Sequence, residues 1–301
     1  MSHVIGRICL AVLRGLTCFI IVTGIAHAGE TLDRIERTGA ITLTNRDTSI
    51  PFSYMDASGK PIGYTVDICM KLVDAISAQL KRPGLKVRFV QVNPSSRFPA
   101  IIEGKADLEC GPTTNNAERR KIVSFTIPNF IASAKMVVKA NSGIKNWSDL
   151  RDRTVVTTKA TTNAQSIAER NNVRALNIRL IEANDDRESF QKIVDGKADV
   201  FAMDDVLLYG LKANVKNPDD YDVVGSPLTV EPYAIMFSRQ DLELKKIVDT
   251  EMARIIQSGE IYSLYRKWFN SPIPPNGANL NMPMNRLLRA SFQFPSDKVA
   301  D

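Results

Sequence analysis

The stretch that decides the fold is IIEGKADL at residues 101–108, because it recurs as IVDGKADV at residues 193–200. In both copies an apolar helical pattern stops at a glycine, Gly104 or Gly196, and a Lys-Ala-Asp turn then begins a strand. Glycine tolerates the left-handed conformation that ends many helices. One helix-turn-strand unit therefore occurs twice. Two copies are too few for a solenoid, and they predict two similar α/β lobes.

The segments around the two copies alternate between helical and strand patterns. Around the first copy we predict strands at 40–45, 85–92 and 106–110, and helices at 30–37, 66–80 and 96–103. Around the second copy we predict strands at 154–158, 178–181 and 198–203, and helices at 162–171 and 187–195. Ligand clefts of open α/β sheets form at the carboxyl ends of the strands, so functional residues are expected directly after strands.

The same patterns divide the chain into domains. We expect a signal peptide at 1–28, a first lobe built from 29–134 plus 235–270, and a second lobe at 135–234. Extended segments at 130–139 and 233–238 are the predicted hinge crossings, and helices at 241–257 and 260–269 return to the first lobe. The proline- and asparagine-rich tail at 271–301 is expected to wrap the first lobe.

The N-terminus has the features of a secretory signal. Arg7 and Arg14 precede an apolar run at 15–25, and Ala-His-Ala at 26–28 fits the small-x-small pattern of a cleavage site. The run is shorter than the roughly 20 residues that span a bilayer. Cys18 lacks the small residue that precedes a lipidated cysteine. We therefore expect cleavage after Ala28 and export to the periplasm.

Composition excludes several classes of function. The formal charge of +6 falls to +4 without Arg7 and Arg14, and basic residues are dispersed among acids, so a nucleic-acid partner is not supported. Both histidines, His3 and His27, lie in the presequence, which excludes histidine-dependent catalysis and histidine-containing zinc sites from the mature chain. No metal or cofactor is expected, and the protein is expected to be monomeric.

Two cysteines, Cys69 and Cys110, remain in the mature chain. In an oxidising compartment two thiols more often pair than stay free, which favours a disulfide between them. Two buried, unpaired thiols are the alternative.

Six segments spread over nearly the whole mature chain carry a family resemblance. They are PFSY at 51–54, GY at 63–64, ECGPTTNNAER at 109–119, MDD at 203–205, SGE at 258–260 and KWFNSPIPP at 267–275. With them the chain resembles the polar amino-acid family of bacterial periplasmic binding proteins, specifically its glutamate/aspartate-binding branch. The resemblance implies the type II periplasmic-binding-protein fold, an α/β architecture of two Rossmann-like lobes with a two-strand hinge. It also implies an ABC permease as partner, and no catalysis.

A free amino acid presents a carboxylate and an ammonium group on neighbouring atoms, so its site needs an arginine fork, hydroxyl donors and an acid. By resemblance, Arg119 binds the α-carboxylate with help from Thr114 and Thr162, and Asp204 accepts from the ammonium group. Spacing alone leaves other interpretations open: Arg119 as a solvated helix residue, and Asp204 with Asp205 as a helix cap.

Side-chain selection is assigned to Arg46 and Arg97, which match the two arginines that hold the distal carboxylate in this branch. A neutral ligand would leave both guanidinium groups unpaired. Its binding would lack several charge-assisted hydrogen bonds, each worth about 1.5–3 kcal/mol. Phe52 and Tyr54 are expected to form an apolar wall that excludes water from the cleft. Ordinary core packing is the alternative for both aromatic side chains.

Three positions depart from the branch. Pro94 and Pro112 stand where it tends to have serine, although the carbonyl of Pro112 can still accept from the ammonium group. Asp186 stands where the branch tends to have histidine. A carboxylate there would repel the distal carboxylate and attract an amide, unless it pairs with Arg46 or Arg97 or faces away. Glutamine or asparagine therefore stays open as the ligand.

Two rival functions come from other classes. A periplasmic cyclohexadienyl dehydratase can be built on the same fold, but with no histidine its general acid would have to be a carboxyl group such as Asp186 or Asp204. A sensory ligand-binding domain would need a fused transmembrane or kinase segment, and none follows Phe269 in the sequence.

Overall fold

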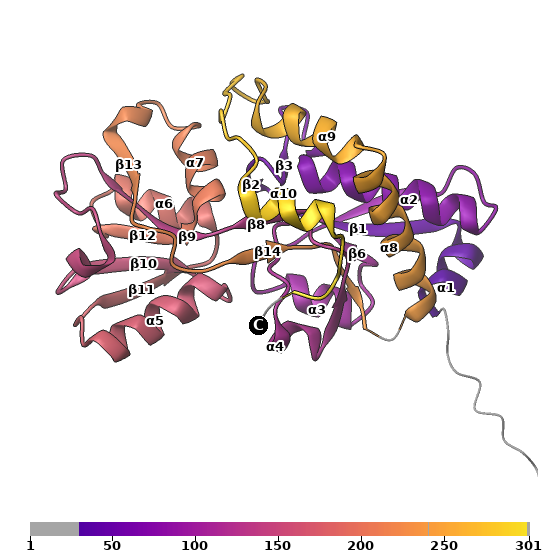
Figure 1. Ribbon diagram of the computed structural model, residues 1–301, viewed down its shortest axis with the longest axis horizontal. Coiled ribbons are helices and arrows are strands. Elements are labelled where there is room, and N and C mark those ends of the chain that lie inside the picture. Colours follow the sequence, from indigo (N-terminus) through magenta and orange to yellow (C-terminus); the bar gives the residue numbers. More distant parts are fainter. Residues whose placement is uncertain (1–29, 240, 300–301) are drawn as a thin grey trace, which may run out of the picture.

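The computed structural model describes residues 30–239 and 241–299, and its chain forms two lobes side by side (Figure 1). The predicted signal peptide at 1–28 lies outside the described residues. No helix in the described part of the chain has the length and apolar character needed to cross a membrane.

The first lobe is built on a five-stranded sheet in the order β5-β1-β6-β15-β7. The strands are β1 (Ala40–Asn45), β5 (Lys86–Gln91), β6 (Leu108–Glu109), β7 (Val123–Phe125) and β15 (Met236–Ser238). Strands β1, β5 and β6 run parallel, and β15 is antiparallel to β6 and β7. The helices of this lobe are α1 (Glu30–Thr38), α2 (Tyr64–Gln79), α3 (Arg97–Ile102), α4 (Ala117–Arg120), α8 (Leu242–Gln257) and α9 (Glu260–Phe269).

The second lobe repeats this arrangement in the order β11-β10-β12-β9-β13. Its strands are β9 (Ala134–Lys139), β10 (Thr154–Thr158), β11 (Arg179–Ala183), β12 (Val200–Asp204) and β13 (Tyr221–Val224). Its helices are α5 (Thr162–Arg174), α6 (Asp186–Val194) and α7 (Asp205–Lys212), with short 3-10 turns η1 (Trp147–Leu150) and η2 (Pro218–Asp220). In each lobe the central parallel strand is flanked by two others, and an antiparallel strand continues the sheet.

The repeated Lys-Ala-Asp turn performs the same task in both lobes. The carboxylate of Asp107 accepts a hydrogen bond from the N–H of Thr42 at 2.7 Å, and that of Asp199 accepts from the N–H of Thr154 at 2.8 Å. Each aspartate thus ties the turn to the neighbouring central strand. The sequence repeat therefore reflects one structural unit used twice.

The two lobes are joined by a short antiparallel ladder, in which β8 (Phe130–Ala132) pairs with β14 (Glu231–Tyr233) (Figure 1). The extended segment at 130–139 consists of two strands, because the backbone of Ser133 bonds to Asp205 at the start of α7 and so separates β8 from β9. The extended segment at 233–238 is likewise interrupted between β14 and β15, because the N–H groups of Ala234 and Ile235 bond to Thr113 and Thr126.

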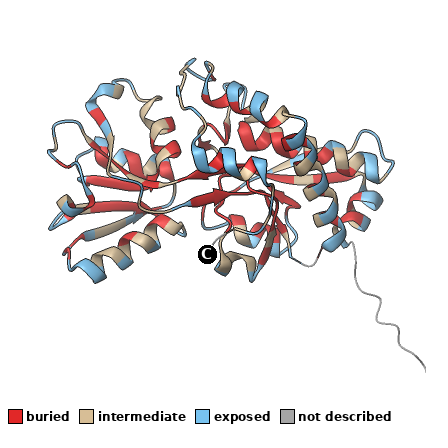
Figure 2. Ribbon diagram, in the orientation of Figure 1, coloured by how far each residue is buried: buried red, intermediate tan, exposed pale blue. Residues whose placement is uncertain are grey.

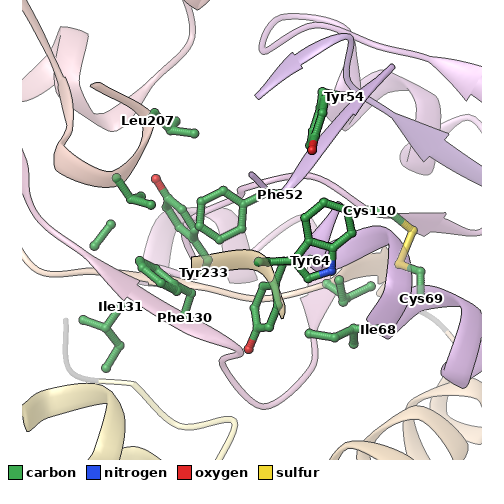
Figure 3. Packing of buried hydrophobic residues seen from close by; sticks show 14 of the residues in the cluster. Phe52, Tyr54, Tyr64, Ile68, Cys69, Cys110, Phe130, Ile131, Leu207 and Tyr233 are labelled. Carbon is green, nitrogen blue, oxygen red and sulfur yellow. A yellow bond between two sulfur atoms is a disulfide. The ribbon is translucent and has the colours of Figure 1, made fainter. Parts of the chain in front are cut away.

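The strands of this ladder are buried (Figure 2), and an aromatic cluster fills the core beside them (Figure 3). Phe52 lies with its ring edge-on to Tyr64, Phe130, Tyr233 and Phe269, with ring centroids 5.0–6.1 Å apart. Edge-to-face pairs of this kind add about 0.5–1.5 kcal/mol beyond the burial of their area. The hinge is therefore anchored on a rigid apolar base in the first lobe.

The predicted disulfide is confirmed: Cys69 of α2 is bonded to Cys110, which directly follows β6 (Figure 3). The bond fixes α2 to the end of β6. The loop that follows β6 contains Pro112 and Thr114. A small sheet consists of β2 (Thr48–Ser49), β3 (Ser53–Met55) and β4 (Pro61–Ile62). Its strands β3 and β4 contact α2, and β2 contacts α6 of the second lobe.

The C-terminal tail reaches the hinge. It ends in α10 (Arg286–Gln293), whose cap residue Asn285 donates to the carbonyl of Ile131 in β8 at 2.8 Å. The hydroxyl of Tyr54 donates to the carbonyl of Pro274 at 2.8 Å, which holds the tail on the first lobe. Asn276 donates to Asn214 at 3.3 Å, a contact with the second lobe.

Candidate ligand-binding site

A narrow cavity lies between the two lobes. Its lining residues follow the carboxyl ends of strands in both sheets. They are Arg46, Pro94, Arg97, Pro112, Thr114, Arg119, Thr161, Thr162, Asn163, Asp186, Met203, Asp204 and Leu207. Eight of the ten ligand-binding residues predicted from the sequence are in this set, as is the departing residue Pro94.

The first lobe supplies three arginines to the cavity. Arg46 follows β1, Arg97 is the first residue of α3, and Arg119 belongs to α4. Arg119 is held by a 2.9 Å hydrogen bond from its Nη1 to the carbonyl of Thr114, and the guanidinium groups of Arg97 and Arg119 lie 5.1 and 5.2 Å from the ring of Phe98. The guanidinium groups of Arg97 and Arg119 are therefore held in place, whereas Arg46 is anchored through its backbone N–H, which donates to Ser53 Oγ at 2.9 Å.

Burial of these arginines has an electrostatic cost. Desolvation, together with Arg119 and Arg46, lowers the pKa of Arg97 to about 9. Desolvation also lowers the pKa of Arg119, although nearby Glu231 and Asp204 oppose that shift. Both groups stay cationic at neutral pH. A bound anion would relieve their mutual repulsion, so the cluster is suited to a negatively charged ligand.

The second lobe faces these cations with a helix N-terminus. Thr161 caps α5, since its hydroxyl accepts from the N–H of Ala164 at 3.2 Å. Thr162 and Asn163 form the first turn, where backbone N–H groups have no partner within the helix and attract anions. A carboxylate lying between this turn and Arg119 would be bound from both lobes.

An acid at the end of β12 completes this part of the cavity. Asp204 accepts from Asn163 Nδ2 at 3.0 Å and from the hydroxyl of Tyr233. Burial and the nearby carboxyl of Glu231 raise the pKa of Asp204 to about 8. A ligand ammonium group beside Asp204 would offset both effects, because an opposite charge stabilises the ionised carboxylate.

Glu231 is a functional candidate that the sequence reasoning missed. It is buried in hinge strand β14, and its Oε2 accepts from the hydroxyl of Thr162 at 2.9 Å. The Thr162 hydroxyl is thus already engaged, and the backbone N–H of α5 is the freer donor. The signal in the sequence was a lone acid inside the otherwise uncharged segment 225–238.

Asp186 also faces the cavity. It is the first residue of α6, only 1% exposed, and its Oδ1 accepts from the hydroxyl of Thr158 at 2.7 Å. Its Oδ2 has no hydrogen-bond partner within residues 30–239 and 241–299. Desolvation raises the pKa of Asp186, although the charges of Arg46 and Arg97 oppose the shift.

Phe52 and Tyr54 do not line the cavity, so their prediction as its apolar wall is wrong. Phe52 lies one layer deeper, edge-on to Tyr233, whose hydroxyl contacts Asp204. Tyr54 contacts Trp268 and the tail. Both side chains are needed in the aromatic core, where their large apolar area is removed from water.

Contacts across the cleft show that the lobes are closed on each other. Arg97 Nη2 of the first lobe lies 3.5 Å from the carbonyl of Ala160 in the second. Gly210 of α7 approaches the carbonyl of Ile50 so closely that an added Cβ would collide with it. Closure therefore depends on a residue without a side chain at position 210.

Comparisons with known proteins identify the family. Residues 41–271 match the sequence profile of the bacterial extracellular solute-binding proteins, family 3. An L-glutamate/L-aspartate-binding protein of Pseudomonas aeruginosa is 43% identical over 90% of this chain and 90% of its own. A glutamate/aspartate import solute-binding protein of Escherichia coli is 37% identical over the same shares.

Solved structures show the same fold. An ancestral amino-acid-binding protein, described as a precursor of cyclohexadienyl dehydratase, is 29% identical with a TM-score of 0.67, covering 79% of this chain and 98% of its own. An ancestral arginine-binding protein bound to glutamine is 26% identical with a TM-score of 0.68, covering 77% and 98%. These neighbours indicate that the cleft belongs to an architecture used for free amino acids.

Proposed function

Because the chain belongs to the bacterial extracellular solute-binding proteins of family 3, we propose that it binds an acidic L-amino acid, glutamate or aspartate, for delivery to an ABC importer. One observation carries the proposal: the buried Arg46 and Arg97, the half-buried Arg119 and the buried acid Asp204 converge on one small cavity between the lobes. A neutral or basic ligand would leave buried guanidinium groups without partners, which is costly.

The positions of the charged groups around the cavity assign the ligand one orientation. Its α-carboxylate lies between Arg119 and the first turn of α5, and its ammonium group lies at Asp204. The carbonyl of Pro112 is a second acceptor for the ammonium group. The distal carboxylate then reaches Arg46 and Arg97 at the opposite end. Each bond involves a charged group and so contributes about 1.5–3 kcal/mol.

Binding is completed by closure of the lobes. Arg46, Arg97 and Arg119 come from the first lobe, whereas Thr162 and Asp204 come from the second, so only a whole amino acid connects both sides. The β8–β14 ladder is short enough to bend while the aromatic core beneath it stays fixed. The closed form is then the form that docks on the membrane permease.

Several further features belong to the proposal. The protein acts in the periplasm after cleavage behind Ala28, as a monomer without catalytic activity. The lobes comprise 29–134 plus 235–270 and 135–234, and the tail 271–301 wraps the first lobe.

Calorimetric titration of residues 29–301, freed of bound ligand by unfolding and refolding, tests the function. We expect saturable micromolar or tighter binding of glutamate and aspartate, and much weaker binding of glutamine and asparagine. Binding of the amides alone would instead make Asp186 the acceptor for an amide N–H. If none of the four binds, turnover of prephenate or arogenate is the next assay.

A further inference from the structure

The cavity contains a carboxyl group whose presence conflicts with an acidic ligand. Asp186 Oδ2 is buried and, among the described residues, unpartnered, while the rest of its side chain is fixed by Thr158. It lines the same cavity as Arg46 and Arg97, where the distal carboxylate of glutamate would lie. Two ionised carboxylates side by side out of water repel each other strongly.

A count of charges around the cavity increases this conflict. Arg46, Arg97 and Arg119 face Asp186, Asp204, Glu231 and Glu109, the last of which is fully buried and acts on both Arg97 and Arg119. With every group ionised, the empty site would have one excess negative charge, and glutamate would add another. A buried site disfavours such an excess, so entry of the ligand should be accompanied by a proton.

Resting on the proposed function, we propose that an acidic amino acid binds together with one proton, which is held on Asp186 Oδ2. The O–H of Asp186 donates to one oxygen of the distal carboxylate, and Arg46 and Arg97 donate to the remaining lone pairs. The proton comes from solvent, no covalent bond of the ligand changes, and it returns to solvent on release.

The charges around Asp186 act in opposite directions. Burial and Asp185 of its own helix cap favour a proton on Asp186, whereas the positive charges of Arg46, after β1, and Arg97, in α3, oppose it. The distal carboxylate of the ligand would engage both arginines and so reduce their opposition. Strand β10 contributes only the neutral hydroxyl of Thr158, and α7 contributes Leu207 to the cavity. Asp204 of β12 lines the cavity too, and it is neutralised by the ligand ammonium group, which leaves Asp186 uncompensated.

The ionisation state of Asp186 also decides which ligand fits. A protonated Asp186 is a donor and matches a carboxylate, whereas an ionised Asp186 is an acceptor and matches the NH₂ of an amide. Selectivity for glutamate over glutamine should therefore fall as pH rises. The protonation of this one residue would thus make the selectivity between glutamate and glutamine depend on pH.

The test is calorimetric titration at pH 7.5 in buffers with different ionisation enthalpies, which gives the number of protons taken up. The ammonium group of either ligand displaces the proton that Asp204, with a pKa of about 8, holds in the empty site, so the proton balance is compared between the two ligands. We expect binding of glutamate to take up as much as one proton more than binding of glutamine. The ratio of the dissociation constant of glutamate to that of glutamine should rise by up to tenfold per pH unit above neutrality, because linkage to one proton gives a slope of one.

Two variants locate the proton. Asp186→Asn keeps the shape and offers an N–H donor, so glutamate should bind with the same proton balance as glutamine. Glu182→Gln, which removes an exposed carboxyl of β11 outside the cavity, should keep the difference between the two ligands. Thermal unfolding of both variants checks that they fold.

The outcomes are distinct from those for the proposed function. Absence of glutamate binding contradicts that function itself. Glutamate binding with no more proton uptake than glutamine overturns the present inference alone. An excess proton uptake with glutamate that persists in Asp186→Asn, or that is lost in Glu182→Gln, overturns its assignment to Asp186.

Discussion

Replacing Arg46 by methionine separates recognition of the distal carboxylate from recognition of the rest of the amino acid. Arg46 is 3% exposed, and no residue that the structure describes accepts a hydrogen bond from its guanidinium group, so the group is available to the ligand. Methionine retains much of the apolar stem and removes only the charged fork. The unliganded fold should therefore change little, which thermal unfolding can verify.

The expected loss follows from the number of bonds. A carboxylate can accept two bonds from the fork, each worth about 1.5–3 kcal/mol, so the dissociation constant for glutamate should rise by about 10² to 10⁴. Glutamine has one acceptor oxygen at this position and should lose at most one such bond, about 10- to 150-fold. Arg46→Lys keeps the charge without the fork and should lie between the wild type and the methionine variant.

Titration calorimetry of ligand-free protein measures all of these constants, with competition titrations for the tightest. Since Arg97 remains in Arg46→Met, some preference for the acid should survive, and removal of both arginines should abolish it. A change of less than about threefold for glutamate, or equal losses for glutamate and glutamine, would refute the assignment of Arg46 to the distal carboxylate.

Three other perturbations test separate features of the molecule. Asp204→Asn should weaken the binding of acidic ligands and of their amides alike, by about 10- to 150-fold, because it removes the charged acceptor of the ammonium group that all of them share. Because burial raises the pKa of Asp204 to about 8, the native state retains a proton that the unfolded chain loses near pH 4. The free energy of unfolding of the empty protein should thus decrease from pH 4 to pH 8 in denaturant titrations, and this contribution should vanish in Asp204→Asn. Gly210→Ala should weaken the binding of every ligand without lowering the melting temperature of the empty protein. The reason is that its Cβ collides with Ile50 only when the cleft is closed. An unchanged affinity would show that closure tolerates the methyl group. Loss of the Cys69–Cys110 disulfide, which links residues 41 positions apart, should lower the free energy of unfolding by about 4 kcal/mol, measured as a shift in denaturation midpoint with a reductant.

Local patterns were sufficient for most of the architecture. The repeat around Gly104 and Gly196 predicted two lobes, and the structure has two sheets whose three parallel strands have the same order. Strands β1 and β10 and helix α9 begin and end where their periodicity indicates. Apolar periodicity and turn residues are local properties, so the sequence displays them directly. The breaks at Ser133 and Ala234 could not be predicted, because they arise from hydrogen bonds to distant segments.

The chemistry of the site was also readable in outline. Spacing after strands, and resemblance to a known branch, identified the eight residues that converge on the cavity. What the sequence by itself determined is thus the two-lobed α/β plan, the disulfide and the residue types available for an amino acid. Only the tertiary structure decided that Phe52 and Tyr54 belong to the core, that Glu231 enters the site from the hinge, and that Asp186 faces the arginines with a free oxygen. These facts depend on which side chains meet across lobes, and the direction and burial of a side chain are set by contacts between residues far apart in the chain.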